Sequence, residues 1–349
     1  MGKFLLGGGI ISHMKKQCLV SYNNIVAVDN LLSAWREFIK GKRSKPDVLE
    51  FSLSLIDNIL QLYNDLANQT YRPGGYKSFY ITDPKSRHIH KASVRDRLVH
   101  HAIYRQLYPF FARIFIADSY SCQVGKGTHR AIARFKNFSQ RASQNNTITG
   151  WVLKGDVKKF FESIDQNILL NIFSEYIADI DVINLLTKIV RSFEVKPSKG
   201  LPLGNLTSQL FVNVYMNKFD QFIKHKIKAR YYIRYADDFI ILSDNKESLL
   251  RDQQLIREFL RYDLKLILHP HKIFIKTIAS GIDFLGWVNF PYHSVLRTKT
   301  KNRMMDRIKK NSAPQSLASY LGLLKYGDTF KVKHELLNNY WMRGNIKEF

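Results

Sequence analysis

The feature that most restricts how this chain can fold is the stretch YYIRYADDFIIL, residues 231–242. It is almost wholly apolar and aromatic, yet Asp237 and Asp238 stand side by side in its middle. The apolar runs on both sides predict a strand, a tight turn and a second strand, with the two acids at the tip of the hairpin. Because isolated buried carboxylates are costly, something has to compensate these two acids.

Divalent metal ions are the compensation that this pattern favours. At a hairpin tip two successive side chains can reach one site, and magnesium binds one or two carboxylates together with substrate phosphates. A pair of such ions, about 3.5–4 Å apart, serves phosphoryl transfer. The arrangement needs a further acid, which Asp156 supplies at the end of the apolar strand predicted in WVLKGDVKKFF. The alternative is a pair of turn-forming aspartates on a solvated hairpin, and the aromatic flanks and the second acid-bearing strand argue against it.

Hydrophobic periodicity indicates a chain that mixes helices and strands. Apolar residues at helical spacing predict helices over 28–43, 49–66, 94–115, 163–177, 207–227, 246–264 and 297–310. Other patterns predict a hairpin over 71–93, a strand leading into Asp156, and short strands within 264–276 and 280–290. Asp165 is placed to cap the helix that follows it. We therefore expect an α+β fold in which helices pack on a sheet layer.

The charge balance points to a polyanionic partner. The chain has 54 lysine and arginine residues against 29 aspartate and glutamate residues, a net charge of +25 spread along its length. Nucleic acid is the first candidate, and a basic protein without such a ligand is the alternative. Cys18 and Cys122 provide neither a disulfide framework nor a zinc ribbon. No apolar run reaches transmembrane length, so we expect no membrane partner and a reducing, cytoplasmic setting.

Between about residues 80 and 290, a series of ordered blocks that includes YADD and LKGDVKKFF resembles those of reverse transcriptases. The others are RHIHKASVRDRLVHHAI, DSYSCQVGKGTHRAI, GLPLGNLTSQLFVNVYMNKFD, LILHPHKIF and GIDFLGW. The resemblance implies an RNA-directed DNA polymerase of right-hand architecture, with fingers, an antiparallel palm sheet packed by helices, and a small helical thumb. The corresponding divisions are a helical extension and the start of the fingers (1–80), fingers (81–150), palm (151–290, with a fingers insertion near 165–200) and thumb (291–349).

The resemblance also implies roles for individual residues. Asp156, Asp237 and Asp238 would be the catalytic metal ligands, joined by the backbone carbonyl of Val157. They would hold two Mg²⁺ ions, for which Mn²⁺ could substitute.

Further residues would bind the nucleotide and the primer. Lys85 and Arg87 would hold the triphosphate through charge-assisted contacts, although an ordinary basic turn is the alternative. Phe161 would lie under the sugar and exclude a 2′-hydroxyl, and Lys272 is at the place where a lysine protonates pyrophosphate. The remaining assignments are Leu203, Gly204 and Gln209 beside the nucleotide, and Phe284, Leu285 and Gly286 in the turn that grips the primer end.

The block GLPLGNLTSQ distinguishes between subfamilies. Group II intron and retron enzymes typically have glutamine before this glycine and a later Ser-Pro pair, whereas this chain has Leu203 and then Ser208-Gln209. The combination resembles diversity-generating retroelement enzymes, which implies error-prone copying of a template-repeat RNA, especially opposite adenines. Leucine offers only apolar contact where glutamine can form a hydrogen bond, so discrimination between right and wrong pairs is expected to fall.

That resemblance implies several partners and leaves alternatives open. The partners are template RNA, a DNA or RNA primer, deoxynucleoside triphosphates and a small basic accessory protein. The alternatives are another bacterial reverse transcriptase of phage-defence, retron or group II type, or a non-catalytic nucleic-acid-binding relic. The presence of all three acids argues against the relic.

Overall fold

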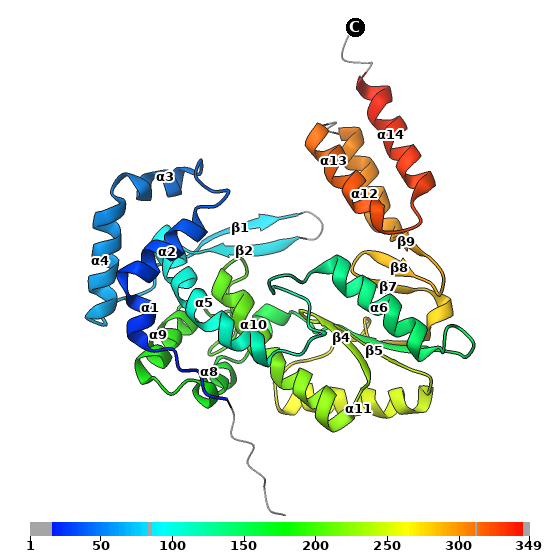
Figure 1. Ribbon diagram of the computed structural model, residues 1–349, viewed down its shortest axis with the longest axis horizontal. Helices are drawn as coiled ribbons and strands as arrows, with labels where there is room; N and C mark the ends of the chain where they lie inside the picture. The colour runs from blue at the N-terminus through cyan, green and yellow to red at the C-terminus, as the bar shows by residue number, and fades with distance from the viewer. Residues whose placement is uncertain (1–15, 83–85, 311–312, 345–349) are drawn as a thin grey trace, which may run out of the picture. The chain divides into compact units, whose positions relative to one another are not determined.

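The computed structural model describes residues 16–82, 86–310 and 313–344 (Figure 1). The chain divides into two compact units. The first unit comprises residues 1–114 and 161–215, and the second comprises residues 115–160 and 216–349. The helices and strands confirm a mixed α+β fold with antiparallel sheets. The finer division into fingers, palm and thumb stays a prediction. None of the helices in the described ranges is both long and apolar enough to cross a bilayer.

The first unit is mainly helical and carries one hairpin. Strand β1 (Lys77–Ile81) pairs antiparallel with β2 (Arg87–Lys91), as predicted. Of the DPKS segment expected at the tip of this hairpin, residues 83–85 lie outside the described residues. The predicted helix over 49–66 is divided at Ser54, whose φ of −120° and ψ of 44° interrupt it. The helices are α1 (Tyr22–Val26), α2 (Val28–Phe38), α3 (Pro46–Leu53), α4 (Leu55–Ala67), α5 (Val94–Ile114), α8 (Gln166–Tyr176), α9 (Ile180–Arg191) and the first part of α10 (Leu206–Phe222).

Two local predictions in the first unit can be compared directly with the structure. Asp165 caps α8 as expected, since its Oδ1 accepts hydrogen bonds from the backbone N–H groups of Asn167 and Ile168. Helix α9 was not predicted, and it begins at a second aspartate cap, Asp179.

The second unit is built on a four-stranded antiparallel sheet in the order β4–β5–β3–β6. The strands are β3 (Trp151–Gly155), β4 (Tyr231–Tyr235), β5 (Asp238–Ser243) and β6 (Phe274–Thr277). A smaller sheet has the order β7–β8–β9, from Ile282–Phe284, Trp287–Asn289 and Ser294–Leu296. The strand expected within 264–276 forms only at its end, because Pro270 has no N–H to donate and the preceding residues make a single bridge, Leu268 to Val157.

Helices cover both faces of this sheet. Helix α6 (Thr128–Ala142) lies on one side of β4 and β5 and α11 (Lys246–Tyr262) on the other (Figure 1). The α6 side forms a buried cluster that includes Phe135, Val152, Ile233 and Ile240. On the α11 side, the Phe219 ring near the end of α10 contacts the rings of three residues: Tyr232, Phe239 and Phe259. Both faces are apolar because alternate residues of each strand are buried on opposite sides.

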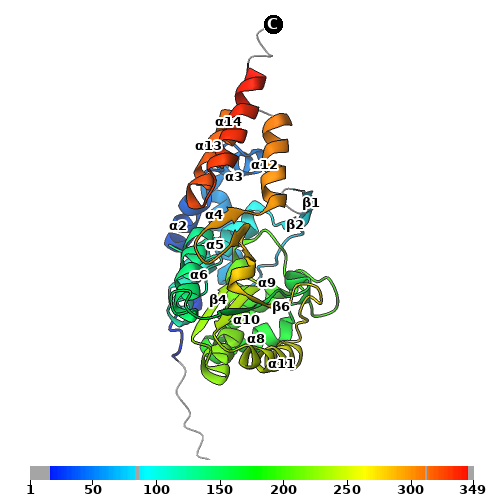
Figure 2. The same cartoon turned by 90° about the vertical axis from the view of Figure 1, so that its right-hand side faces the viewer.

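The C-terminal part of the second unit is helical. The predicted helix over 297–310 is α12 (Thr298–Lys310), and it is followed by α13 (Pro314–Leu323) and α14 (Phe330–Gly344). Helices α12 and α14 run beside each other in both views (Figure 2). An ion pair between Lys301 and Glu335, with 2.7 Å between Nζ and Oε2, joins them.

Candidate active site

The turn between β4 and β5 carries the two adjacent acids, as predicted. Tyr235 pairs with Asp238, so only Ala236 and Asp237 form the turn. Ala236 has a φ of +56°, in the left-handed region that alanine rarely adopts. Asp238 begins β5 and lies on the same face as Ile240, two residues further on.

The third acid is next to this turn because β3 pairs with β5. Gly155 is opposite Phe239 in the ladder, and Asp156 follows at the end of β3. A Cβ atom on Gly155 would lie 2.3 Å from the Phe239 ring. Only glycine therefore allows this close approach between the two acid-bearing strands.

A short backbone pairing holds the segment that contains Asp156. The Asp156 carbonyl accepts a hydrogen bond from the His269 N–H at 2.8 Å, and the Lys158 N–H donates to the Ile267 carbonyl at 2.8 Å. Val157, between them, bridges Leu268, and the two bonds of this bridge leave the Val157 carbonyl outside the pairing. That orientation is compatible with the predicted use of the carbonyl as a metal ligand.

Lysine side chains lie beside two of the three acids. Lys272 Nζ lies 3.1 Å from both carboxylate oxygens of Asp156, and Lys154 Nζ lies 3.1 Å from Oδ2 of Asp238. Burial raises the pKa of Asp238 to about 6; the charges of Asp156 and Asp237 also raise it, and Lys154 opposes the shift. Oδ1 of Asp238 is buried without a hydrogen-bond partner.

These donors match the chemistry of a hard divalent cation, although they do not form a closed cage. Among the described residues, no three His, Cys, Asp or Glu side chains converge closely enough to hold a metal ion as they stand. The orphaned Oδ1 of Asp238 and the mutual repulsion of the acids are nevertheless what a bound cation would relieve. The oxygen donors of Asp156, Asp237, Asp238 and the Val157 carbonyl are of the type that Mg²⁺ prefers, and their use as metal ligands stays a prediction.

The predicted primer-binding turn joins β7 to β8. Phe284 pairs with Trp287, so Leu285 and Gly286 form a two-residue loop, with φ values of +53° and +90°. The Phe284 side chain is fully buried and lies near the Phe135 ring, so it belongs to the core. Leu285 is partly buried and packs against the same cluster, and Gly286 is also only partly exposed.

The other predicted nucleotide-binding residues belong to the first unit, and Lys85 lies outside the described residues. Arg87 begins β2 and is exposed. The Leu203 carbonyl accepts a hydrogen bond from the His90 N–H at 2.9 Å, which ties this loop to β2. Gly204 has a φ of +114°, and a Cβ there would lie 2.7 Å from Ile89. The Phe161 carbonyl accepts a hydrogen bond from the Leu201 N–H, and Gln209 lies in the first turns of α10.

Three buried charged residues close to the acids were not predicted: Lys154, Asp220 and Arg234. Each lies in a segment that was predicted as a strand or a helix from its apolar residues alone. A single charge inside an otherwise apolar strand or helix was the available signal, because a buried charge is retained only with a partner. Lys154 stands two residues before Asp156, and Arg234 three residues before Asp237.

Comparisons with known proteins concern the family of the chain and do not test the individual site residues. Residues 82–288, more than half of the chain, match the family described as "Reverse transcriptase (RNA-dependent DNA polymerase)". Protein YkfC of Escherichia coli K12 is 26% identical over 306 residues, which cover 75% of this chain and 78% of YkfC. The group II intron-encoded protein LtrA of Lactococcus lactis is 21% identical over 302 residues, 66% of this chain and 49% of LtrA. The chain thus spans about half the length of LtrA.

Two further similarities are weaker. The putative COX1/OXI3 intron 2 protein of Saccharomyces cerevisiae is 22% identical over 294 residues, 64% of this chain and 32% of that protein. A solved structure of apo telomerase from Candida tropicalis, truncated from its C-terminal domain, aligns with a TM-score of 0.47 and 14% identity. That alignment covers 69% of this chain and 60% of the telomerase chain.

Proposed function

Since the chain belongs to the reverse transcriptase family of RNA-directed DNA polymerases, we propose that it makes cDNA from a template-repeat RNA in a diversity-generating retroelement. Copying would be error-prone at template adenines. The observation that carries this proposal is Leu203 before Gly204, together with Ser208-Gln209 in the same block. A leucine side chain cannot form the hydrogen bond that a glutamine would offer near the nascent sugar and the templating pair.

The surroundings of Leu203 support this assignment. The Leu203 carbonyl is held by the His90 N–H, and the Asn205 side chain donates to the His90 carbonyl at 2.8 Å. The backbone of this loop is therefore fixed on both sides of Gly204. A substitution of the partly exposed Leu203 side chain can then change contacts to the nucleotide without moving the loop.

The chemistry we assign to the acids follows from their surroundings. Asp156, Asp237 and Asp238, with the Val157 carbonyl, would hold the two Mg²⁺ ions, and Mn²⁺ could replace them. When bound, the ions supply charge stabilisation to the attacking and leaving oxygens in phosphoryl transfer. Lys154 would keep its ion pair with Asp238. The Lys272 side chain is 42% exposed and could leave Asp156 to bind a phosphate oxygen.

A sequencing experiment tests the proposal. Purified protein extends a primer on a defined RNA template with Mg²⁺ and deoxynucleotides, alone and with its own retroelement RNA and any adjacent small basic protein. Asp237→Ala is the blank. We expect wild-type errors to concentrate opposite template adenines and Leu203→Gln to reduce them.

A matched control makes the result specific. Leu206→Gln introduces the same chemical change three residues away, at a half-buried position that begins α10, and should leave the adenine errors unchanged. If Leu203→Gln leaves adenine misincorporation unchanged, the account based on Leu203 is wrong.

A second candidate is an intron-associated reverse transcriptase, favoured by the intron-encoded relatives named above. Evenly low errors in the same extension assay would support it and reject the mutagenic subfamily. The family's polymerase activity is common to both candidates.

A further inference from the structure

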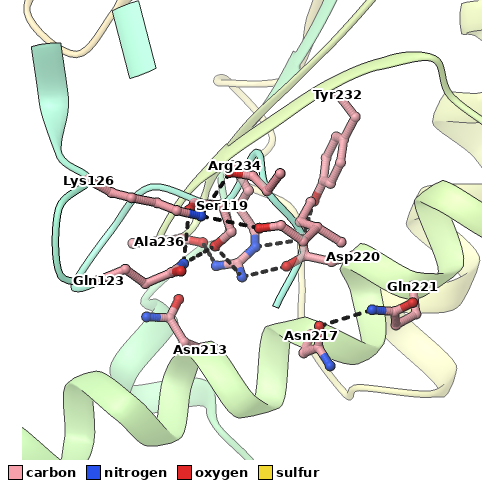
Figure 3. Close-up of polar contacts among 12 residues, drawn as sticks. Ser119, Gln123, Lys126, Asn213, Asn217, Asp220, Gln221, Tyr232, Arg234 and Ala236 are labelled. Atoms are coloured by element: carbon pink, nitrogen blue, oxygen red, sulfur yellow. Dashed lines mark hydrogen bonds and ion pairs between the residues drawn. The ribbon is translucent and has the colours of Figure 1, made fainter. Parts of the chain in front are cut away.

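A buried arginine lies directly behind the acid-bearing turn. Arg234, in β4, pairs with Asp220 of α10 (Figure 3). Neither side chain has any exposed surface. Arg234 Nε lies 2.7 Å from Oδ1 of Asp220, and Nη2 lies 2.6 Å from Oδ2. The Tyr232 hydroxyl donates to the same Oδ1 at 2.7 Å. A buried pair of this kind adds little net stability over an apolar packing of similar volume, so its presence requires another reason.

The guanidinium group also reaches the turn itself. Its Nη1 donates to the Ala236 carbonyl at 3.0 Å (Figure 3). That carbonyl and the Asp237 N–H belong to one planar peptide unit. Fixing the carbonyl therefore fixes the direction in which the chain enters Asp237. The same bond helps to hold the turn around Ala236, whose φ of +56° lies in the left-handed region that alanine rarely adopts.

A third set of contacts anchors the arginine to the loop before α6. Nη2 donates to Ser119 Oγ at 3.0 Å, and the Arg234 N–H donates to the Asp118 carbonyl at 3.0 Å. Gln123 Nε2 donates to both Oγ and the carbonyl oxygen of Ser119 at 2.9 Å. Lys126 Nζ donates to the carbonyl groups of Ala117 and Ser119, each at 2.8 Å. The Lys126 ammonium group thus binds backbone carbonyl groups of this loop.

We propose that Arg234, held by Asp220, is a positioning residue that aims the Ala236–Asp237 turn so that Asp237 and Asp238 can bind metal ions together. A planar guanidinium satisfies Asp220, Ser119 and the Ala236 carbonyl in three directions at once, which a lysine ammonium at the end of a flexible chain cannot do. The inference rests on the proposed metal-binding role of the two aspartates and on the polymerase activity of the family, and it is independent of the retroelement subfamily.

The test compares Arg234→Lys with Tyr232→Phe. Arg234→Lys keeps a positive charge beside Asp220 but loses the bond to the Ala236 carbonyl. Tyr232→Phe removes one hydroxyl from the same buried Asp220 and leaves the Arg234 bonds to Asp220, Ser119 and the Ala236 carbonyl in place, so it controls for damage to the network. The readouts are kcat and KM for primer extension, the Mg²⁺ concentration at half-maximal rate, and Mn²⁺ binding to the protein alone, followed by the EPR signal of free Mn²⁺.

We expect Arg234→Lys to lower kcat by ~10- to 100-fold, with KM changed by less than about 3-fold. Its Mg²⁺ requirement should rise and its Mn²⁺ affinity should fall by roughly 5-fold or more, since a misdirected turn separates the ligands. Tyr232→Phe should lower the melting temperature while its metal dependence stays at the wild-type value. The inference is overturned if Arg234→Lys retains wild-type metal dependence, or if Tyr232→Phe shifts it equally.

Two additions keep the outcomes separate. If Arg234→Lys does not fold, Ser119→Ala takes its place, because it removes one acceptor of Nη2 and leaves both bonds to Asp220. A raised metal requirement in Ser119→Ala supports the inference, and an unchanged one overturns it. Mn²⁺ binding by Asp237→Ala tests the metal site itself. If this variant binds Mn²⁺ as wild type does, the proposed metal site fails and the inference fails with it. If it does not, while Arg234→Lys matches wild type, only the inference fails.

Discussion

Lys154 Nζ lies 3.1 Å from Oδ2 of Asp238 and donates a second hydrogen bond, of 2.7 Å, to the Asp283 carbonyl. The first contact reaches a metal-ligand candidate, and the second reaches β7, just before the Leu285-Gly286 turn. The Lys154 side chain is only 11% exposed. One buried ammonium group therefore links the candidate metal site to the predicted primer-binding turn, both within the second unit.

Replacing Lys154 should make Asp238 harder to ionise. Lys154 lowers the pKa of Asp238, so Lys154→Met should move the acid limb of the pH–rate profile to higher pH. It should also lower the free energy of unfolding by about 3 kcal/mol above pH 7, since it leaves a buried charge unpaired. Single-turnover extension rates between pH 5 and 9 measure the first effect, and Lys154→Arg is the charge-preserving control. An acid limb at the same pH in Lys154→Met would contradict the assigned role.

Asp238 should make stability depend on pH and on metal. Its folded pKa of about 6 exceeds its ordinary value of 3.8. The folded state therefore holds the proton more tightly than the unfolded state does. This contribution to the free energy of unfolding, about 3 kcal/mol, is complete below about pH 4 and is lost as the pH rises through 6.

Denaturant titrations in EDTA measure this contribution as the difference between wild type and Asp238→Asn. The difference should change with pH between about 4 and 6, and it should shrink when Mg²⁺ is added above pH 6, because the ion binds the ionised form. A difference that is the same at every pH would show that Asp238 is not perturbed by its surroundings.

Lys272 competes with a metal ion for Asp156, since Nζ lies 3.1 Å from both carboxylate oxygens. We expect Lys272→Ala to lower the Mg²⁺ or Mn²⁺ concentration needed for half-saturation. The same change should lower kcat by roughly 10- to 100-fold if Lys272 donates a proton to the leaving pyrophosphate. Mn²⁺ titration and pre-steady-state extension separate the two effects. Lys276→Ala, which removes a lysine of β6, is the control and should change neither the metal concentration at half-saturation nor kcat. Weaker metal binding in Lys272→Ala would refute the competition.

Gly155 should resist substitution because of its neighbour across the ladder. A Cβ atom would lie 2.3 Å from the fully buried Phe239 ring, so Gly155→Ala forces that ring to move. We expect a loss of about 1–3 kcal/mol in the free energy of unfolding, together with reduced activity from displaced acids. Gly322→Ala is the matched control in helix α13, where nothing lies within 4 Å of the added atom, and it should be neutral or stabilising. Equal stability of the two variants would contradict this account.

The apolar patterns of the sequence were sufficient to predict the β4–β5 hairpin, the strand before Asp156, and most long helices. These elements depend on local periodicity and caps, as at Asp165, and neighbouring residues carry that information. Of the segment 264–276, in which a short strand was expected, only the end forms strand β6, and Leu268 makes a single bridge to Val157, a pairing that depends on a distant segment.

The sequence by itself determined the identity of the three acids, their order along the chain and the family to which it belongs. Only the tertiary structure decided which charges meet. Lys154 reaches Asp238 because β3 pairs with β5, and Arg234 reaches Asp220 because β4 packs on the end of α10. Linear spacing carries no signal for such contacts, since strand pairing and helix packing bring together residues that are far apart in the chain, and burial then makes each contact strong enough to matter.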